Sequence, residues 1–125
     1  MELYLEDASV TNTGLEALAT LRKLETLSLA GTAVNDRGLK SLSGLTRLRR
    51  LLLDRTDLGG QGLGHLAALL QLHELRLDDT KVDDVGLIHL RNFSNLRALG
   101  LEDTRVTGKG LAHVGGLSRL EARPG

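Results

Sequence analysis

Hydrophobic residues recur along this chain with a period of 24 residues. In the segment 72–95, LHELRLDDTKVDDVGLIHLRNFSN, leucines occupy positions 1, 4 and 6, and apolar residues return at positions 11, 16, 19 and 22. Apolar and polar residues alternate over positions 3 to 7, from Glu74 to Asp78, which predicts a strand with one buried face. Position 12 carries residue types that cap helices, and the later apolar residues recur at helical spacing, so we expect a turn and then a helix of about eight residues.

The same pattern fills the whole chain. A shortened copy occupies 1–23, full copies occupy 24–47, 48–71, 72–95 and 96–119, and a broken terminal coil covers 120–125, where Arg123 and Pro124 interrupt the pattern. We number the first five copies coils 1 to 5. Self-similarity with such a period is typical of solenoids, and a helix this short needs neighbouring coils to be stable. We therefore expect one domain, 1–125, that forms part of a longer solenoid.

Stacking such coils predicts a curved molecule. Adjacent parallel strands lie about 4.8 Å apart, whereas packed helices need about 8 to 10 Å. The stack should bend toward a parallel sheet on its concave side, with short helices on its convex side. The pattern LxxLxLxxT, followed by V and GLxxL, resembles the leucine-rich repeat family, and most closely its 24-residue ribonuclease-inhibitor-like, GALA-type repeats. This resemblance implies an α/β leucine-rich repeat solenoid whose concave sheet binds protein partners.

One departure from that family is systematic. The family usually has Asn at position 9, where its side chains bond to backbone groups between coils, but this chain has Thr32, Thr56, Thr80 and Thr104. A hydroxyl donates and accepts with less reach than an amide, so we expect a thinner ladder between coils. The alternative is that Thr serves only as a β-branched residue at the strand end.

Composition narrows the choice of partners. The chain has 16 basic and 16 acidic residues and no cysteine. This balance argues against bulk attraction to nucleic acid or membranes, and the lack of cysteine excludes disulfides and thiolate metal sites within this sequence. No signal peptide or membrane span is apparent, and we expect a cytoplasmic setting. Leu3, Leu5 and Leu15 have no polar cap on their open side, which makes end-to-end self-association an option.

Three motifs that suggest chemistry have simpler explanations. Gly62, Gly64 and Ala67 match a dinucleotide fingerprint, but a whole turn separates them from the strand. The histidines at position 18, namely His65, His89 and His113, are expected at the edge of the convex face, too far apart for a metal site. The carboxylates of 78–103 leave calcium as a minor alternative, although their spacing is not that of an EF-hand. No nucleophile, base and acid converge, so we expect no enzyme, cofactor or metal.

Charges border the predicted sheet on both sides. Positions 7 and 8, after each strand, are mostly acidic, and the residues before each strand are mostly basic. Stacked carboxylates either attract a basic partner or bond to backbone groups at the turn. We expect a protein partner of mixed charge on the concave face, bound by Tyr4, Glu6, Arg50, Leu52, Asp54, Arg55, Arg76, Asp78, Asp79, Glu102 and Asp103. Two alternatives remain: a structural spacer in a longer repeat protein, and the substrate-recognition part of a ubiquitin-ligase-like complex.

Overall fold

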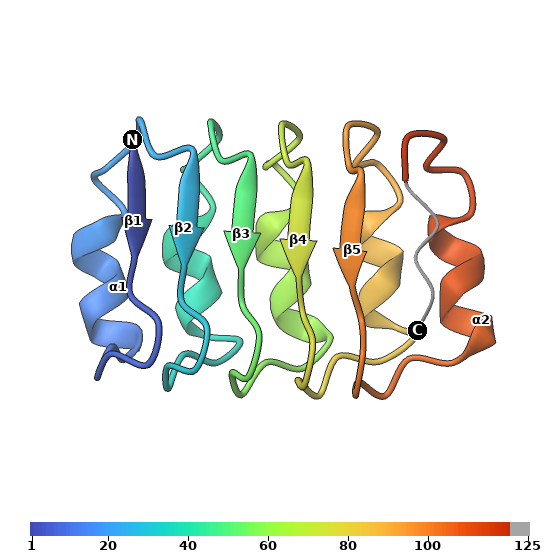
Figure 1. The fold of residues 1–125 in the computed structure, drawn as a ribbon, viewed down its shortest axis with the longest axis horizontal. Helices are drawn as coiled ribbons and strands as arrows, with labels where there is room; N and C mark the ends of the chain where they lie inside the picture. The colour runs from blue at the N-terminus through green and yellow to red at the C-terminus, as the bar shows by residue number, and fades with distance from the viewer. Residues whose placement is uncertain (121–125) are drawn as a thin grey trace.

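The computed structural model describes residues 1–120 as a row of stacked coils. Five strands run side by side, with the helical segments on the far side of the sheet (Figure 1). The strands are β1 (Glu2–Tyr4), β2 (Thr26–Ser28), β3 (Arg50–Leu52), β4 (Glu74–Arg76) and β5 (Ala98–Gly100). The helical segments are α1 (Asn12–Leu18), η1 (Gly38–Leu42), η2 (Gln61–Leu66), η3 (Gly86–Leu90), α2 (Gly108–Leu111) and η4 (Ala112–Val114), where η denotes a 3₁₀-helix. The predicted broken coil lies outside the described residues beyond Leu120.

All five strands are parallel and follow the order of the sequence, β1-β2-β3-β4-β5. Each residue pairs with the residue 24 positions later, so that Leu27 lies beside Leu51 and Leu51 beside Leu75. The sheet register therefore equals the sequence repeat. This arrangement confirms the predicted α/β solenoid with its parallel sheet and short helices.

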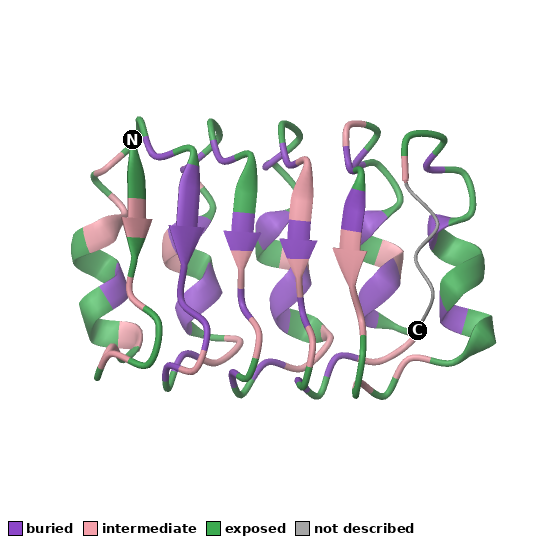
Figure 2. Cartoon of the chain, viewed as in Figure 1, coloured by how far each residue is buried: buried purple, intermediate pink, exposed green. Residues whose placement is uncertain are grey.

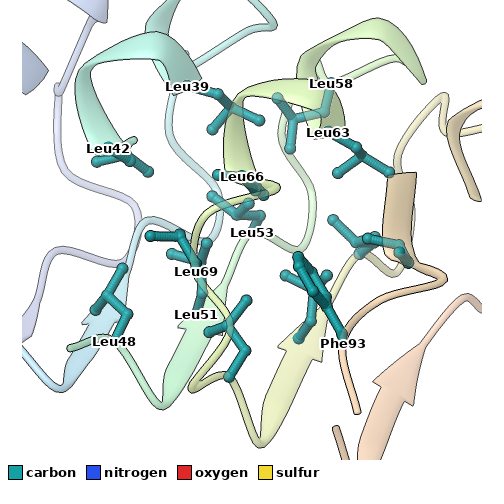
Figure 3. Packing of buried hydrophobic residues seen from close by; sticks show 14 of the residues in the cluster. Leu39, Leu42, Leu48, Leu51, Leu53, Leu58, Leu63, Leu66, Leu69 and Phe93 are labelled. Atoms are coloured by element: carbon teal, nitrogen blue, oxygen red, sulfur yellow. The ribbon is translucent and has the colours of Figure 1, made fainter. Parts of the chain in front are cut away.

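The core is one continuous cluster of leucines between the sheet and the helical segments. Most residues at the repeated apolar positions of coils 2 to 4 are completely buried, and burial is concentrated in these coils (Figure 2). Leu51 and Leu53 from the strand side meet Leu63 and Leu66 from η2, with Phe93 of the next coil beside them (Figure 3). Burying each such side chain contributes about 1.5 to 3 kcal/mol, so adjoining coils stabilise one another.

The predicted helix length is wrong for coils 2 to 4, and the helices there are of the 3₁₀ type. These coils form 3₁₀-helices of five or six residues, not helices of about eight. The spacing of the leucines explains this, because Leu39, Leu42 and Leu45 recur every three residues, which matches the three residues per turn of a 3₁₀-helix. The strands are also shorter than expected, since β4 ends at Arg76 and not at Asp78.

The predicted threonine ladder between coils is also wrong. The hydroxyls of Thr32, Thr56, Thr80 and Thr104 each donate to the backbone carbonyl three residues earlier in their own coil, at 2.7 Å. The short side chain turns back onto the end of its own strand, because it lacks the reach of an amide. Each threonine therefore stabilises the turn of one coil.

Position 13 supplies side-chain hydrogen bonds between the turns of neighbouring coils, beside the backbone bonds that also join them. Asn12, Asp36 and Asp84 accept hydrogen bonds from the backbone N–H groups of Asn35 (3.3 Å), Gly59 (2.8 Å) and Thr107 (2.6 Å). These side chains lie against the glycine at position 15 of the next coil, where a Cβ atom would collide with them at Gly38, Gly62 and Gly110. The repeated glycine thus makes room for the preceding coil.

Candidate functional site

Side chains at positions 3, 5 and 7 of each coil form one surface, which we call the sheet face. Positions 4 and 6 point into the core, so alternation along the strand places positions 3, 5 and 7 on the opposite side. Of the predicted binding residues, Tyr4, Glu6, Arg50, Leu52, Asp54, Arg76, Asp78 and Glu102 hold these positions, and Arg55, Asp79 and Asp103 follow at position 8. The sheet face runs across all five strands, but coil 2 contributes none of the predicted binding residues.

Charges on β3 and β4 are paired with one another. The Arg50 Nε atom lies 3.0 Å from a Glu74 carboxylate oxygen. The Arg76 guanidinium lies 3.6 Å from Glu74 and 3.1 Å from Asp78. Glu74, which was not among the predicted binding residues, thus connects two that were. The spacing of 24 residues between Arg50 and Glu74 is the sequence signal for this pair, because it places them side by side on neighbouring strands.

Asp78 has a structural role in addition. Its Oδ1 atom accepts a hydrogen bond of 2.9 Å from the backbone N–H of Glu102 in the next coil. Gly100 leaves room for this contact, since a Cβ atom there would lie 2.7 Å from the same oxygen. Of the two explanations for the acidic residues after the strands, bonding to the backbone therefore applies to Asp78.

Position 8 has a left-handed backbone in every coil. Asp7, Asp79 and Asp103 have φ angles of 57°, 55° and 54°, a region that Asp tolerates better than most residues. Gly31 takes this position in coil 2 with φ 72°. The acidic residues at position 8 thus follow partly from the shape of the turn.

Arg55 is the exception at position 8. It adopts φ 54° although it is neither Gly, Asn nor Asp, and such a conformation is disfavoured for a long side chain. Its guanidinium reaches across Gly31 to Asp7, two coils away, at 3.1 Å. A side chain at Gly31 would collide with this pair. Coil 2 therefore needs a glycine beneath the ion pair that joins coils 1 and 3.

Two buried polar atoms of the sheet face have no hydrogen-bond partner within residues 1–120. They are the Ser28 hydroxyl on β2 and the Asp54 Oδ1 atom just after β3. Burial, followed by repulsion from Asp78, raises the pKa of Asp54, and the Arg76 charge opposes the shift. Ser28 is fully buried and was missed by the sequence analysis, because a serine within a strand gives no signal of its own.

Apolar surface on the sheet face is limited to a few residues. Tyr4 is 47% exposed, and its hydroxyl donates to Glu2 at 3.2 Å. Leu52 is half-buried. Both flank β2, whose outward residues Thr26 and Ser28 are small and buried.

Other candidate chemistry does not assemble. Within residues 1–120, no three His, Cys, Asp or Glu side chains come together in a way that could hold a metal ion. His65, His89 and His113 are exposed on the helical side. Asp83 accepts from the Gly86 N–H in its own turn, and Asp84 accepts from Thr107 in the next coil. No helix in the described part of the chain is long and apolar enough to cross a membrane.

The fold is that of a leucine-rich repeat solenoid. A family model described as "Leucine Rich repeat" matches residues 20–43, which span the junction of coils 1 and 2 and most of coil 2. No curated protein is significantly similar to the chain in sequence.

Two solved structures from Listeria monocytogenes share the fold. An internalin C2 is 23% identical, with a TM-score of 0.66, and the match covers 96% of this chain and 68% of that one. A second internalin, inlF, is 16% identical, with a TM-score of 0.51, and this chain spans 46% of its length. At these identities the likeness extends to the fold alone.

Proposed function

We propose that this chain is a protein-binding module and that its sheet face contacts the partner. The observation that carries the proposal is the position of the two unpartnered buried polar atoms, Ser28 Oγ and Asp54 Oδ1, which both lie on this face. An unsatisfied buried polar atom costs about 1 to 3 kcal/mol. A positive charge that a partner places beside the Asp54 carboxylate would offset part of that cost without reaching the buried atom, because burial and the neighbouring Asp78 disfavour the ionised form.

The distribution of exposed residues supports the same face. Tyr4 and Leu52 offer apolar contact on either side of β2, and tyrosine is enriched among residues that dominate binding energy. Glu6, Asp79 and Glu102 form no ion pair within the described residues and leave charge for a partner. By contrast, Arg50, Arg76 and Asp78 are paired internally and should contribute less to binding than the sequence alone suggests.

Several finer points remain proposals. The 24-residue repeat favours the ribonuclease-inhibitor-like subtype and a place within a longer solenoid. We also propose that the chain is not an enzyme, because the titratable side chains of the sheet face are either paired with one another or too far apart to act together in catalysis. A spacer role, a substrate-recognition role beside a ubiquitin ligase, and self-association through the end coils are the alternatives to partner binding through the sheet face.

Affinity capture with the double variant Tyr4→Ser/Leu52→Ser tests this proposal. We expect the variant to lose partners that the wild type retains, because its apolar contacts on the sheet face are gone. The matched control is Leu70→Ser/Val85→Ser, which removes two other exposed apolar side chains, 48% and 66% exposed, away from the sheet face. If both variants retain the same partners as the wild type, the sheet face is not the binding surface.

A further inference from the structure

The edge of the sheet at which the strands begin carries unpaired positive charge. Arg22, Lys23, Arg47 and Arg49 are exposed where the chain enters β2 and β3. None of them forms an ion pair with a carboxylate within residues 1–120. We call these four residues the basic edge, and they lie at the upper ends of the strands in Figure 1.

Two adjoining hollows follow the basic edge. One of about 520 Å³ is bordered by Arg22, Lys23 and Arg47. The other, of about 360 Å³, is bordered by Arg49 and by Arg50 of β3. Met1 and Glu25 border both hollows, and Thr26 and Arg50 of the sheet face border the second. The two hollows therefore adjoin, and together we call them the depression.

We infer that this depression binds an acidic, extended peptide segment. Its cations come from two successive loops, those before β2 and β3, and are spread along the edge, which suits a chain with carboxylates at intervals better than a single small anion. An extended peptide rises about 3.3 Å per residue, so a few residues would span neighbouring coils. The inference goes beyond the proposed function because all four residues of the basic edge lie outside the predicted binding residues.

Nucleic acid fits this depression less well than an acidic peptide. Single strands bind through aromatic side chains on which bases stack, and no Phe, Trp or Tyr borders either hollow. Glu25, which borders both hollows, would also repel a continuous row of phosphates. The separate carboxylates of a peptide can instead lie beside the basic residues and away from Glu2 and Glu25, which border the second hollow.

Fluorescence anisotropy with a labelled peptide in which Glu alternates with Ser tests the inference, using the triple variant Arg22→Gln/Lys23→Gln/Arg47→Gln. We expect the wild type to bind the peptide in a salt-dependent manner and the variant to bind at least about tenfold more weakly, because three exposed charge contacts are lost. The matched control is Arg37→Gln/Lys40→Gln/Arg91→Gln, which makes the same change in net charge at exposed residues away from the basic edge. Circular dichroism should report that both variants are folded.

The outcomes separate this inference from the proposed function. Equal weakening in the two triple variants would mean that net charge alone drives binding, and the basic edge would not be a site. Tighter binding of a single-stranded DNA oligonucleotide, lost in the basic-edge variant, would replace the acidic peptide with nucleic acid. The Tyr4→Ser/Leu52→Ser variant should bind the probe like the wild type, since it leaves the basic edge intact, so a failure of the sheet-face proposal would leave this result unchanged.

Discussion

At the scale of single residues, two aspartates have opposite environments. Asp54 lies on the sheet face, where burial and then Asp78 raise its pKa. Asp84 lies in a turn, where hydrogen bonds from the side chain and then the backbone of Thr107 lower its pKa. The first carboxylate destabilises the folded chain when it is ionised, and the second stabilises it. Such destabilising residues are common where a protein keeps a group for binding and not for folding.

Asp54→Asn and Asp84→Asn should therefore change the pH dependence of stability in opposite directions. Because the folded pKa of Asp54 is raised, its contribution is most favourable below its ordinary value of about 3.9 and is lost as the pH rises through the folded pKa. The Asn variant escapes this loss and should be more stable than the wild type near neutral pH. Because the folded pKa of Asp84 is lowered, its contribution is present above the ordinary value and is lost as the pH falls through the folded pKa, so its variant should be less stable near neutral pH.

Urea unfolding of both variants at a series of pH values measures this difference. The curves of each variant and the wild type should converge at the acid end, where both carboxylates are protonated. Variants that change stability in the same direction near neutral pH would contradict the assignment of opposite environments.

At the scale of elements, the close packing of neighbouring helical segments requires glycine at position 15. Gly86 of η3 lies so close to Gly60 that an added Cβ atom would be 2.6 Å from the Gly60 Cα atom. Both contacting groups are backbone, so neither can move without shifting its coil. Gly14 holds the same position in α1, but the nearest atom to its Cβ would be 3.6 Å away on Val10.

The pair Gly86→Ala and Gly14→Ala should separate packing from helix propensity. Gly86→Ala is expected to destabilise the fold by about 1 to 3 kcal/mol through overpacking. Gly14→Ala is expected to stabilise it by about 0.5 to 1 kcal/mol, because alanine loses less entropy in a helix. Chemical denaturation measures both, and destabilisation of similar size in the two variants would show that the close approach at Gly86 is not the cause.

The elements also mark how far the sequence alone could predict this structure. Period-two alternation and the 24-residue repeat were sufficient for the strands, their register and the buried leucines, because one hydrophobic face allows one register. The 3₁₀-helices were predictable in principle from leucines three residues apart, as in Leu39 and Leu42. The 24-residue spacing of Arg50 and Glu74 also signalled their pairing. The hydrogen bond that the Gly59 N–H donates to Asp36 was not predictable, since it depends on which side chain and backbone groups face each other across coils.

At the scale of the whole molecule, interactions between the coils are local. Each strand and each helical segment contacts only its neighbours along the row, so the surface is a repeated strip whose differences come from single substitutions. On the sheet face, coils 3 and 4 are joined by the ion pair between Arg50 and Glu74. Coils 1 to 3 leave the basic edge unpaired, and Tyr4 and Leu52 flank β2 on the face beside it. The basic edge and the apolar residues of the proposed sheet-face site therefore both lie in the first three coils.

Site-specific photo-crosslinking tests the central claim most directly. A photoreactive amino acid would replace Leu52 on the sheet face or, as the matched control, Lys40 in η1 on the helical side. Partners retained by the wild type should crosslink to the protein labelled at position 52 and not to the protein labelled at position 40. Crosslinks from position 40 alone would place the binding surface on the helical side and contradict the account.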